Sequence, residues 1–70
     1  MEKEELTKKV YSLANGIRDV PDICTMIFGE GHGPDTKTKE WFLICEIVDS
    51  LIEAGDIYMK DTGVLLDLWR

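Results

Sequence analysis

The stretch from residue 37 to residue 54 constrains this chain more than any other segment. We predict a helix over 37–54, and its second half has one narrow polar stripe, because the polar residues follow the spacing i, i+3, i+4 and i+7: Glu46, Asp49, Ser50 and Glu53. Nearly every other residue between 41 and 54 is apolar. A helix that is apolar over more than half of its circumference must be covered on several sides. We therefore expect part of this helix to meet a partner or a second copy of the chain.

Length and composition limit what can cover that helix. The chain has 70 residues, which is the size of one small domain and excludes a two-domain enzyme or a long repeat array. Hydrophobic residues make up 44% and charged residues 31%, a composition typical of globular proteins. A core this small only just offsets the conformational entropy lost on folding, so dimerisation is the expected additional source of stability.

The two cysteines, Cys24 and Cys45, both lie within apolar segments. The charged residues that follow Met1 do not resemble a secretory signal. We therefore expect two reduced, buried thiols in a cytoplasmic protein rather than a disulfide. No segment reaches the roughly 18 consecutive apolar residues that a membrane span needs, so no membrane role is expected.

The first half of the chain predicts two helices and a loop. A helix over residues 2–16 has one apolar face, which consists of Leu6, Val10, Leu13, Ala14 and Ile17. Asn15-Gly16 ends it, and Ile17 is expected to fold back onto the last turn. A shorter helix follows over 21–28, with Pro21 at its first position, although a strand over 23–28 stays open. Three glycines and a proline within 29–36 predict an exposed, mobile loop.

The last third of the chain predicts a β-hairpin over residues 57–69. Gly55 is expected to end the long helix, and Asp61-Thr62-Gly63 suits a hairpin turn. The period of two places Val64, Leu66 and Leu68 on one face of the second strand and Leu65, Asp67 and Trp69 on the other. Tyr58 and Trp69 are expected to pair across the hairpin.

The stretch from Val48 to Leu66 resembles the third helix and wing of the winged helix-turn-helix superfamily. The resemblance rests on the spacing Leu51-x-x-x-Gly55-x-Ile57 at the end of an amphipathic helix, followed by a hairpin with a glycine turn. It implies an α+β fold: one small winged-helix-like domain over 1–70, with two or three N-terminal helices, a long third helix and a C-terminal hairpin. The superfamily includes DNA-binding transcription regulators as well as protein-binding and dimerisation modules.

The resemblance would make the long helix a DNA-recognition helix. The candidate contacts to DNA or another anion lie at its N-terminal end and on the wing: Thr36, Lys37, Thr38, Lys39 and Lys60. The charge pattern opposes this role, because the chain carries 14 acidic and 8 basic residues and has no basic residue between Lys39 and Lys60. The loop over 29–36 is also longer than the tight turn of DNA-reading motifs.

No constellation of residues in the sequence predicts catalysis. His32, Cys24 and Cys45 lack the spacing of metal ligands, and His32 is expected to be exposed in its loop. Gly29-x-Gly31-x-Gly33 lacks the spacing of a phosphate-binding loop. We therefore expect no enzyme activity, cofactor, metal or small-molecule substrate.

The expected function is that of a non-catalytic regulatory or protein-interaction module, as a homodimer or with another protein. The candidate interface residues are exposed aromatic, apolar and acidic positions: Phe42, Glu46, Asp49, Glu53, Tyr58, Leu65 and Trp69. For Tyr58 and Trp69 a small hydrophobic cluster over the hairpin is an equal alternative. Two other functions stay open: a DNA-binding transcription regulator that uses residues 36–42 and the wing, and an acidic inhibitor of a nucleic-acid-binding protein.

Overall fold

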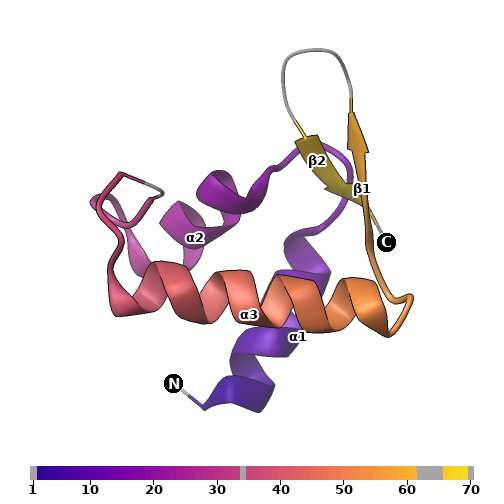
Figure 1. Cartoon of the computed structure of the whole chain (residues 1–70), viewed down its shortest axis with the longest axis horizontal. Helices are drawn as coiled ribbons and strands as arrows, with labels where there is room; N and C mark the ends of the chain where they lie inside the picture. The colour runs from indigo at the N-terminus through magenta and orange to yellow at the C-terminus, as the bar shows by residue number, and fades with distance from the viewer. Residues whose placement is uncertain (1, 34, 62–65, 70) are drawn as a thin grey trace.

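Three helices are followed by a two-stranded antiparallel hairpin (Figure 1). The computed structural model describes residues 2–33, 35–61 and 66–69. The elements in chain order are α1 (Lys3–Leu13), α2 (Val20–Phe28), α3 (Lys39–Glu53), β1 (Tyr58–Asp61) and β2 (Leu66–Trp69). The expected α+β class, with a long third helix and a C-terminal hairpin, is confirmed.

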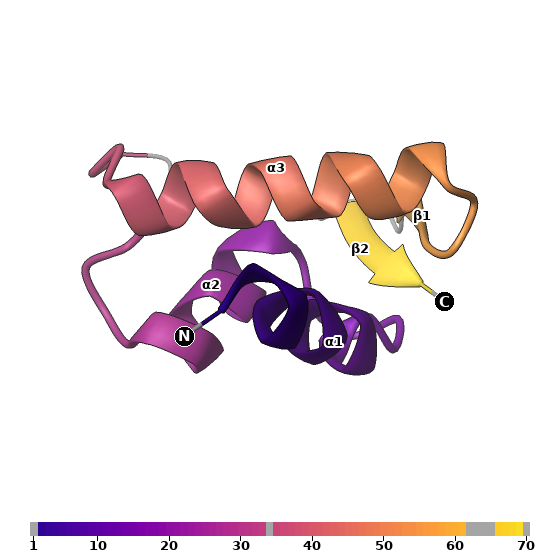
Figure 2. The ribbon, with the colours of Figure 1, turned by 90° about the horizontal axis from the view of Figure 1, so that it is seen from below.

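The long helix α3 forms one layer, and α1 and α2 lie side by side in the layer beneath it (Figure 2). The buried core contains four α3 side chains, namely Ile44, Ile47, Val48 and Leu51. They pack in one cluster with buried side chains of the other elements, which include Leu6, Val10, Ile23, Cys24, Ile57 and Leu68. The chain itself therefore covers most of the apolar circumference of α3. Phe42, with 57% of its surface exposed, is the large apolar residue of α3 that stays uncovered.

The helix α1 ends three residues earlier than the sequence predicts. Its last residue is Leu13, and Gly16 has a φ of 92°, which lies in the left-handed region. The Gly16 N–H donates a hydrogen bond to the carbonyl of Leu68 (2.8 Å), so the chain turns towards the hairpin. The prediction that Ile17 folds back onto α1 is wrong, because 71% of its surface is exposed.

The residues from 20 to 28 form a helix, which settles the open choice between helix and strand. The Asp19 carboxylate caps it by accepting a hydrogen bond from the Asp22 N–H (2.9 Å). Because Val20 is already helical, Pro21 occupies the second position and not the first, and its missing N–H costs no hydrogen bond in the first turn.

The helix α3 begins at Lys39, two residues later than predicted. The Thr38 hydroxyl caps it by accepting a hydrogen bond from the Trp41 N–H (3.3 Å). Lys37 has a φ of 50°, which is incompatible with a right-handed helix. At the other end, Gly55 adopts a left-handed φ of 80° as expected and leads the chain into the hairpin.

The hairpin is joined to the helices through Leu68. Tyr58 lies opposite Trp69, so the predicted pairing across the strands is confirmed. The Leu68 N–H donates to the Arg18 carbonyl (2.9 Å) and its carbonyl accepts from Gly16, so the segment 16–18 lies along β2. The Leu68 side chain is fully buried, whereas Trp69 on the other face of the strand is half-buried. The predictions for Val64 and Leu65 lie outside the described residues.

We predict that Gly16→Ala destabilises the fold by about 3 kcal/mol. A Cβ at Gly16 would lie 2.6 Å from atoms of the Trp69 ring, and the left-handed φ adds backbone strain. Gly31→Ala is the matched control, since Gly31 has a φ of 93° but no neighbour within 4 Å, and it should cost about 1 kcal/mol. Urea unfolding of both variants measures the difference. Equal losses would show that the contact with Trp69 does not require glycine.

Candidate functional site

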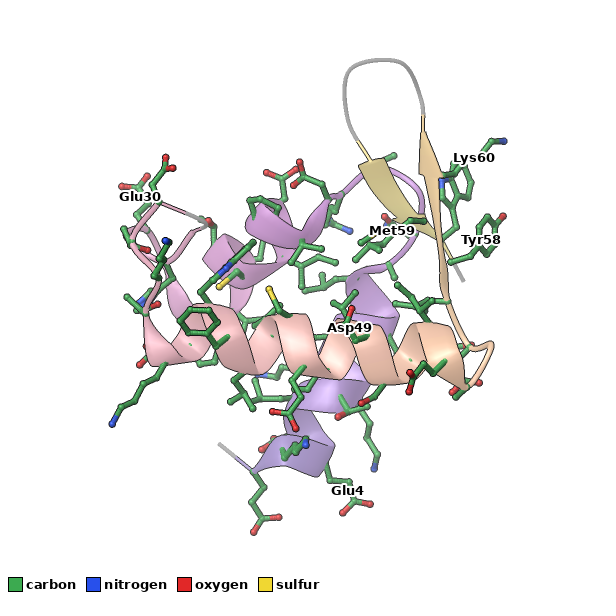
Figure 3. The ribbon with its side chains drawn as sticks, viewed as in Figure 1. Glu4, Glu30, Asp49, Tyr58, Met59 and Lys60 are labelled. Carbon is green, nitrogen blue, oxygen red and sulfur yellow. The ribbon has the colours of Figure 1, made fainter. Side chains whose placement is uncertain are left out.

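Four of the predicted interface residues lie along one exposed stripe of α3. Phe42, Glu46, Asp49 and Glu53 are spaced at i, i+4, i+7 and i+11, and all four are exposed. We call this stripe the outward face of α3. It places an exposed aromatic ring in line with three carboxylates. Figure 3 shows Asp49 on this long helix, well away from Glu4 in α1.

One ion pair lies at the margin of this outward face. Lys3 Nζ in α1 is 2.9 Å from Glu46 Oε1, and both side chains are well exposed. Such an exposed pair contributes less than about 1 kcal/mol. Within the described part of the chain, Asp49 and Glu53 have no ion-pair partner. The face is therefore net negative, and two of its carboxylates are available to a partner.

The hairpin candidates do not form a single exposed surface. Tyr58 is 51% exposed, but Trp69 is half-buried, with its ring against Gly16. Lys60 Nζ lies 5.5 Å from the centre of the Trp69 ring, within the range of a cation–π interaction. Trp69 thus belongs to a small cluster on the hairpin, which was the alternative considered for it. Leu65 lies outside the described residues.

The candidate DNA contacts are not brought together. Thr36 and Thr38 use their hydroxyls within the fold, since Thr36 Oγ1 accepts from the Gly33 N–H (2.8 Å) and Thr38 caps α3. Lys37 and Lys39 are exposed at the N-terminal end of α3. Lys60 lies on the hairpin, which follows the opposite end of α3 (Figures 1 and 3). The structure therefore leaves two lysines at one end of α3 and no continuous basic surface along it.

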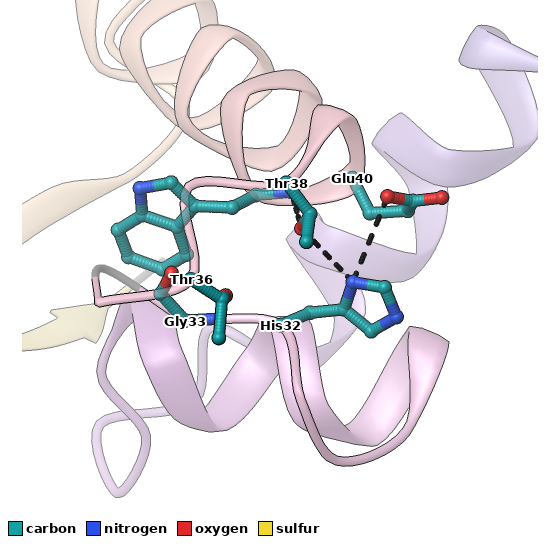
Figure 4. Close-up of polar contacts among 6 residues, drawn as sticks. His32, Gly33, Thr36, Thr38 and Glu40 are labelled. Carbon is teal, nitrogen blue, oxygen red and sulfur yellow. Dashed lines mark hydrogen bonds and ion pairs between the residues drawn. The ribbon is translucent and has the colours of Figure 1, made fainter.

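His32 is half-buried, so the prediction of an exposed histidine is wrong. Its Nδ1 lies 2.9 Å from Thr38 Oγ1 and 3.6 Å from Glu40 Oε2 (Figure 4). Its ring centre is 5.9 Å from that of Phe28. The histidine thereby ties the loop 29–36 to the capping residue of α3. The sequence signal for this contact is a histidine six residues before a capping threonine. That spacing alone does not predict a hydrogen bond between the two side chains.

The two thiols are poorly placed for chemistry. Cys24 is fully buried and Cys45 is half-buried, and neither forms a disulfide. Burial raises the pKa of both thiols, and the charges of Cys45 and Glu40 add to the rise at Cys24. Both are therefore protonated near neutral pH and are weak nucleophiles. Among the described residues, no three His, Cys, Asp or Glu side chains lie close enough together to hold a metal ion.

Comparison with known proteins adds no assignment to this geometry. No protein-family model matches the chain, and no curated protein or solved structure is significantly similar to it. Within the described ranges, no helix has both the length and the apolar character that crossing a membrane requires. The chemistry of the described surface is therefore the basis for any proposal about function.

We predict that the free energy of unfolding falls as the pH rises from about 8 to about 10. The raised pKa of Cys24 means that its thiol ionises first in the unfolded chain, and this favours unfolding at high pH. Stability is fully retained below the ordinary thiol pKa. Cys24→Ala should show a shallower fall in urea titrations across this range, whereas Met26→Ala, which removes an exposed thioether, should keep the wild-type slope. Identical slopes for wild type and Cys24→Ala would contradict the assignment.

Proposed function

We propose that this chain is a non-catalytic protein-interaction module that docks a partner protein through the outward face of α3. The observation that carries the proposal is the exposure of Phe42 on a helix whose other large apolar residues are buried or half-buried. An exposed aromatic side chain is a favoured anchor at protein interfaces. The described residues offer no competing nucleophile or metal cluster.

The charge of the face defines the kind of partner. Glu46, Asp49 and Glu53 follow Phe42 along the same stripe and make it negatively charged, and the whole chain carries a net charge of −6. A partner surface with Lys or Arg side chains around an apolar pocket is complementary to this arrangement. A phosphate backbone laid along the same stripe would be repelled.

The winged-helix-like fold remains part of the proposal. The order of three helices and a hairpin supports it, as does the left-handed Gly55 between α3 and the hairpin. The attachment of β2 to residues 16–18 gives the hairpin a fixed position beside the helices. A wing held in this way suits a recognition surface that is built on α3.

We predict that Phe42→Ala weakens binding of the partner at least tenfold without loss of stability, because the ring is exposed. A photo-crosslinking residue at position 42 identifies the partner, and calorimetry with the purified pair measures the affinity. Asp49→Asn with Glu53→Gln should weaken binding further and reduce its salt dependence. Glu4→Gln with Glu5→Gln removes the same charge from exposed positions of α1 and is the control. Unchanged affinity for Phe42→Ala would refute this docking face.

A DNA-binding transcription regulator is the second candidate, and the exposed Lys37 and Lys39 at the start of α3 are the observation in its favour. It predicts salt-dependent binding to a DNA duplex that Lys37→Glu with Lys39→Glu abolishes. We expect no duplex binding by fluorescence anisotropy even at low salt. Tight binding that responds to this pair of changes would favour the regulator over the protein-docking module.

An acidic inhibitor of a nucleic-acid-binding protein is a special case of the same docking face. The basic surface of the partner would then be its nucleic-acid site, with Glu46, Asp49 and Glu53 in the place of phosphates. Competition between this chain and DNA for the identified partner distinguishes the two cases. Competition that persists after all three acids are neutralised would rule out the inhibitor.

A further inference from the structure

The hairpin has one open edge, and it belongs to β1. The strand β2 has a neighbour on each side, because it pairs with β1 and its Leu68 is hydrogen bonded to the segment 16–18. The strand β1 is therefore the outer strand. Among the described residues, no backbone–backbone hydrogen bond joins it to anything beyond β2. An outer strand of this kind exposes unpaired backbone groups to which another strand can be added.

The backbone of Met59 points to this open edge. The N–H and C=O of Leu68 both point to the segment 16–18, so they do not bond to Met59, which lies opposite Leu68 in the hairpin. Hydrogen-bonded and non-hydrogen-bonded positions alternate along an antiparallel pair of strands. The N–H and C=O of Met59 therefore point away from β2, whereas those of Tyr58 and Lys60 point towards it.

The side chains of β1 alternate between the two faces of the sheet. Figure 3 shows Tyr58 and Lys60 on one side of β1 and Met59 on the other. All three are exposed, and Met59 leaves 43% of its surface uncovered although it shares a face with the buried Leu68. Lys60 already lies against an aromatic ring, since its Nζ is 5.5 Å from the centre of the Trp69 ring. A strand added to this edge would meet an aromatic, an apolar and a cationic side chain in turn.

We propose that β1 pairs antiparallel with β1 of a second copy, so that the two hairpins form one continuous sheet around a two-fold axis. The axis passes through Met59, whose N–H donates to the Met59 carbonyl of the second copy and whose carbonyl accepts the reciprocal bond. Each Tyr58 ring then lies opposite Lys60 of the second copy, an attractive cation–π arrangement. This edge is separate from the outward face of α3, and the inference does not depend on that face.

The residues along β1 select this register from the four positions that the axis can take on the strand. An axis at Lys60 or at Asp61 would place two like charges directly opposite each other, which is destabilising. An axis at Tyr58 would require Met59 to pair with Ile57, whose N–H already donates to a carbonyl of α3 (3.4 Å). The axis at Met59 opposes no like charges and uses backbone groups that have no other described partner.

Two properties of the chain limit the strength of this dimer. A contact between strands of four residues is small, so the association is weak. Each copy also carries a net charge of −6, and the repulsion between copies is screened by salt. We therefore expect a dimer that forms at high protein concentration and becomes more stable as the salt concentration rises.

Met59→Pro tests the strand pairing, because proline has no N–H to donate. The variant should still fold, since this N–H has no partner within the hairpin and proline is tolerated at such positions of edge strands. In sedimentation equilibrium, the mass of the wild-type chain should rise with concentration to that of a dimer and no further. Met59→Pro should lower the association constant at least tenfold. Met59→Ala keeps the N–H and is the control, with an association constant within about threefold of wild type.

Two substitutions at Tyr58 test the register without changing the backbone. Tyr58→Glu places a carboxylate opposite Lys60 of the second copy, whereas Tyr58→Lys places a second ammonium group there. The glutamate variant should associate at least tenfold more tightly than the lysine variant. Net charge alone predicts the reverse order, because Tyr58→Glu makes an acidic chain more acidic. This comparison decides the question even if circular dichroism shows that Met59→Pro is unfolded.

Hydrogen exchange measured by NMR locates the contact. In dilute samples the Met59 amide should exchange freely, and the Lys60 amide, which is bonded to β2, should be protected. At concentrations that form the dimer, exchange of the Met59 amide should slow at least tenfold. A chain that stays monomeric at millimolar concentration and high salt would overturn the inference, and so would a dimer that a folded Met59→Pro leaves intact or tighter association of Tyr58→Lys than of Tyr58→Glu. Crosslinking from position 42 tests the outward face of α3 separately.

Discussion

Burial of the inner side of α3 is the constraint on which the rest of this structure depends. Ile44, Ile47, Val48 and Leu51 together supply more of the buried core than any other element. Removing one such side chain from water contributes about 1.5–3 kcal/mol, a large share of the stability that a domain of this size can have. Since these four positions fix how α3 is rotated, they also fix which of its residues face outward. The core therefore determines the candidate docking face.

The backbone of Leu68 makes the second contact on which the fold depends. It joins β2 to the segment between α1 and α2. Both of its backbone groups are bonded to the segment 16–18, and its side chain is buried. Trp69 then lies against Gly16, where no larger residue fits without displacement. A hairpin of two short strands is only marginally stable alone, so these contacts are what give it a defined place. The contact between Gly16 and Leu68 spans 52 residues of sequence, so no local pattern in the sequence predicts it.

The periodicity of apolar residues was enough to predict where the helices lie in the sequence, but not the residues at which they begin and end. The spacing of Leu6, Val10 and Leu13 correctly indicated the buried side of α1, because burial of a helix depends on a local repeat. The end of α1 was misplaced because Gly16 is held by Leu68, a partner that no local pattern reveals. Likewise, the left-handed φ of Lys37 moved the start of α3 to Lys39. His32 was misjudged for the same reason, since its contact with Thr38 depends on how the loop folds back.

The candidate site shows the same division between local and long-range information. The outward stripe of Phe42 and three acids could be read from the sequence, since one helix carries all four residues. The ion pair between Lys3 and Glu46 could not, because it exists only once α1 packs against α3. The large apolar surface of α3 suggested a broad interface, yet the helices and hairpin of the chain cover most of it, and Phe42 is the large apolar residue of α3 that stays exposed. What remains is one aromatic anchor among carboxylates, and such a contact gains its specificity from charge and its strength from a single side chain. A contact built on a single exposed aromatic side chain has a small apolar centre, and this favours reversible over permanent association.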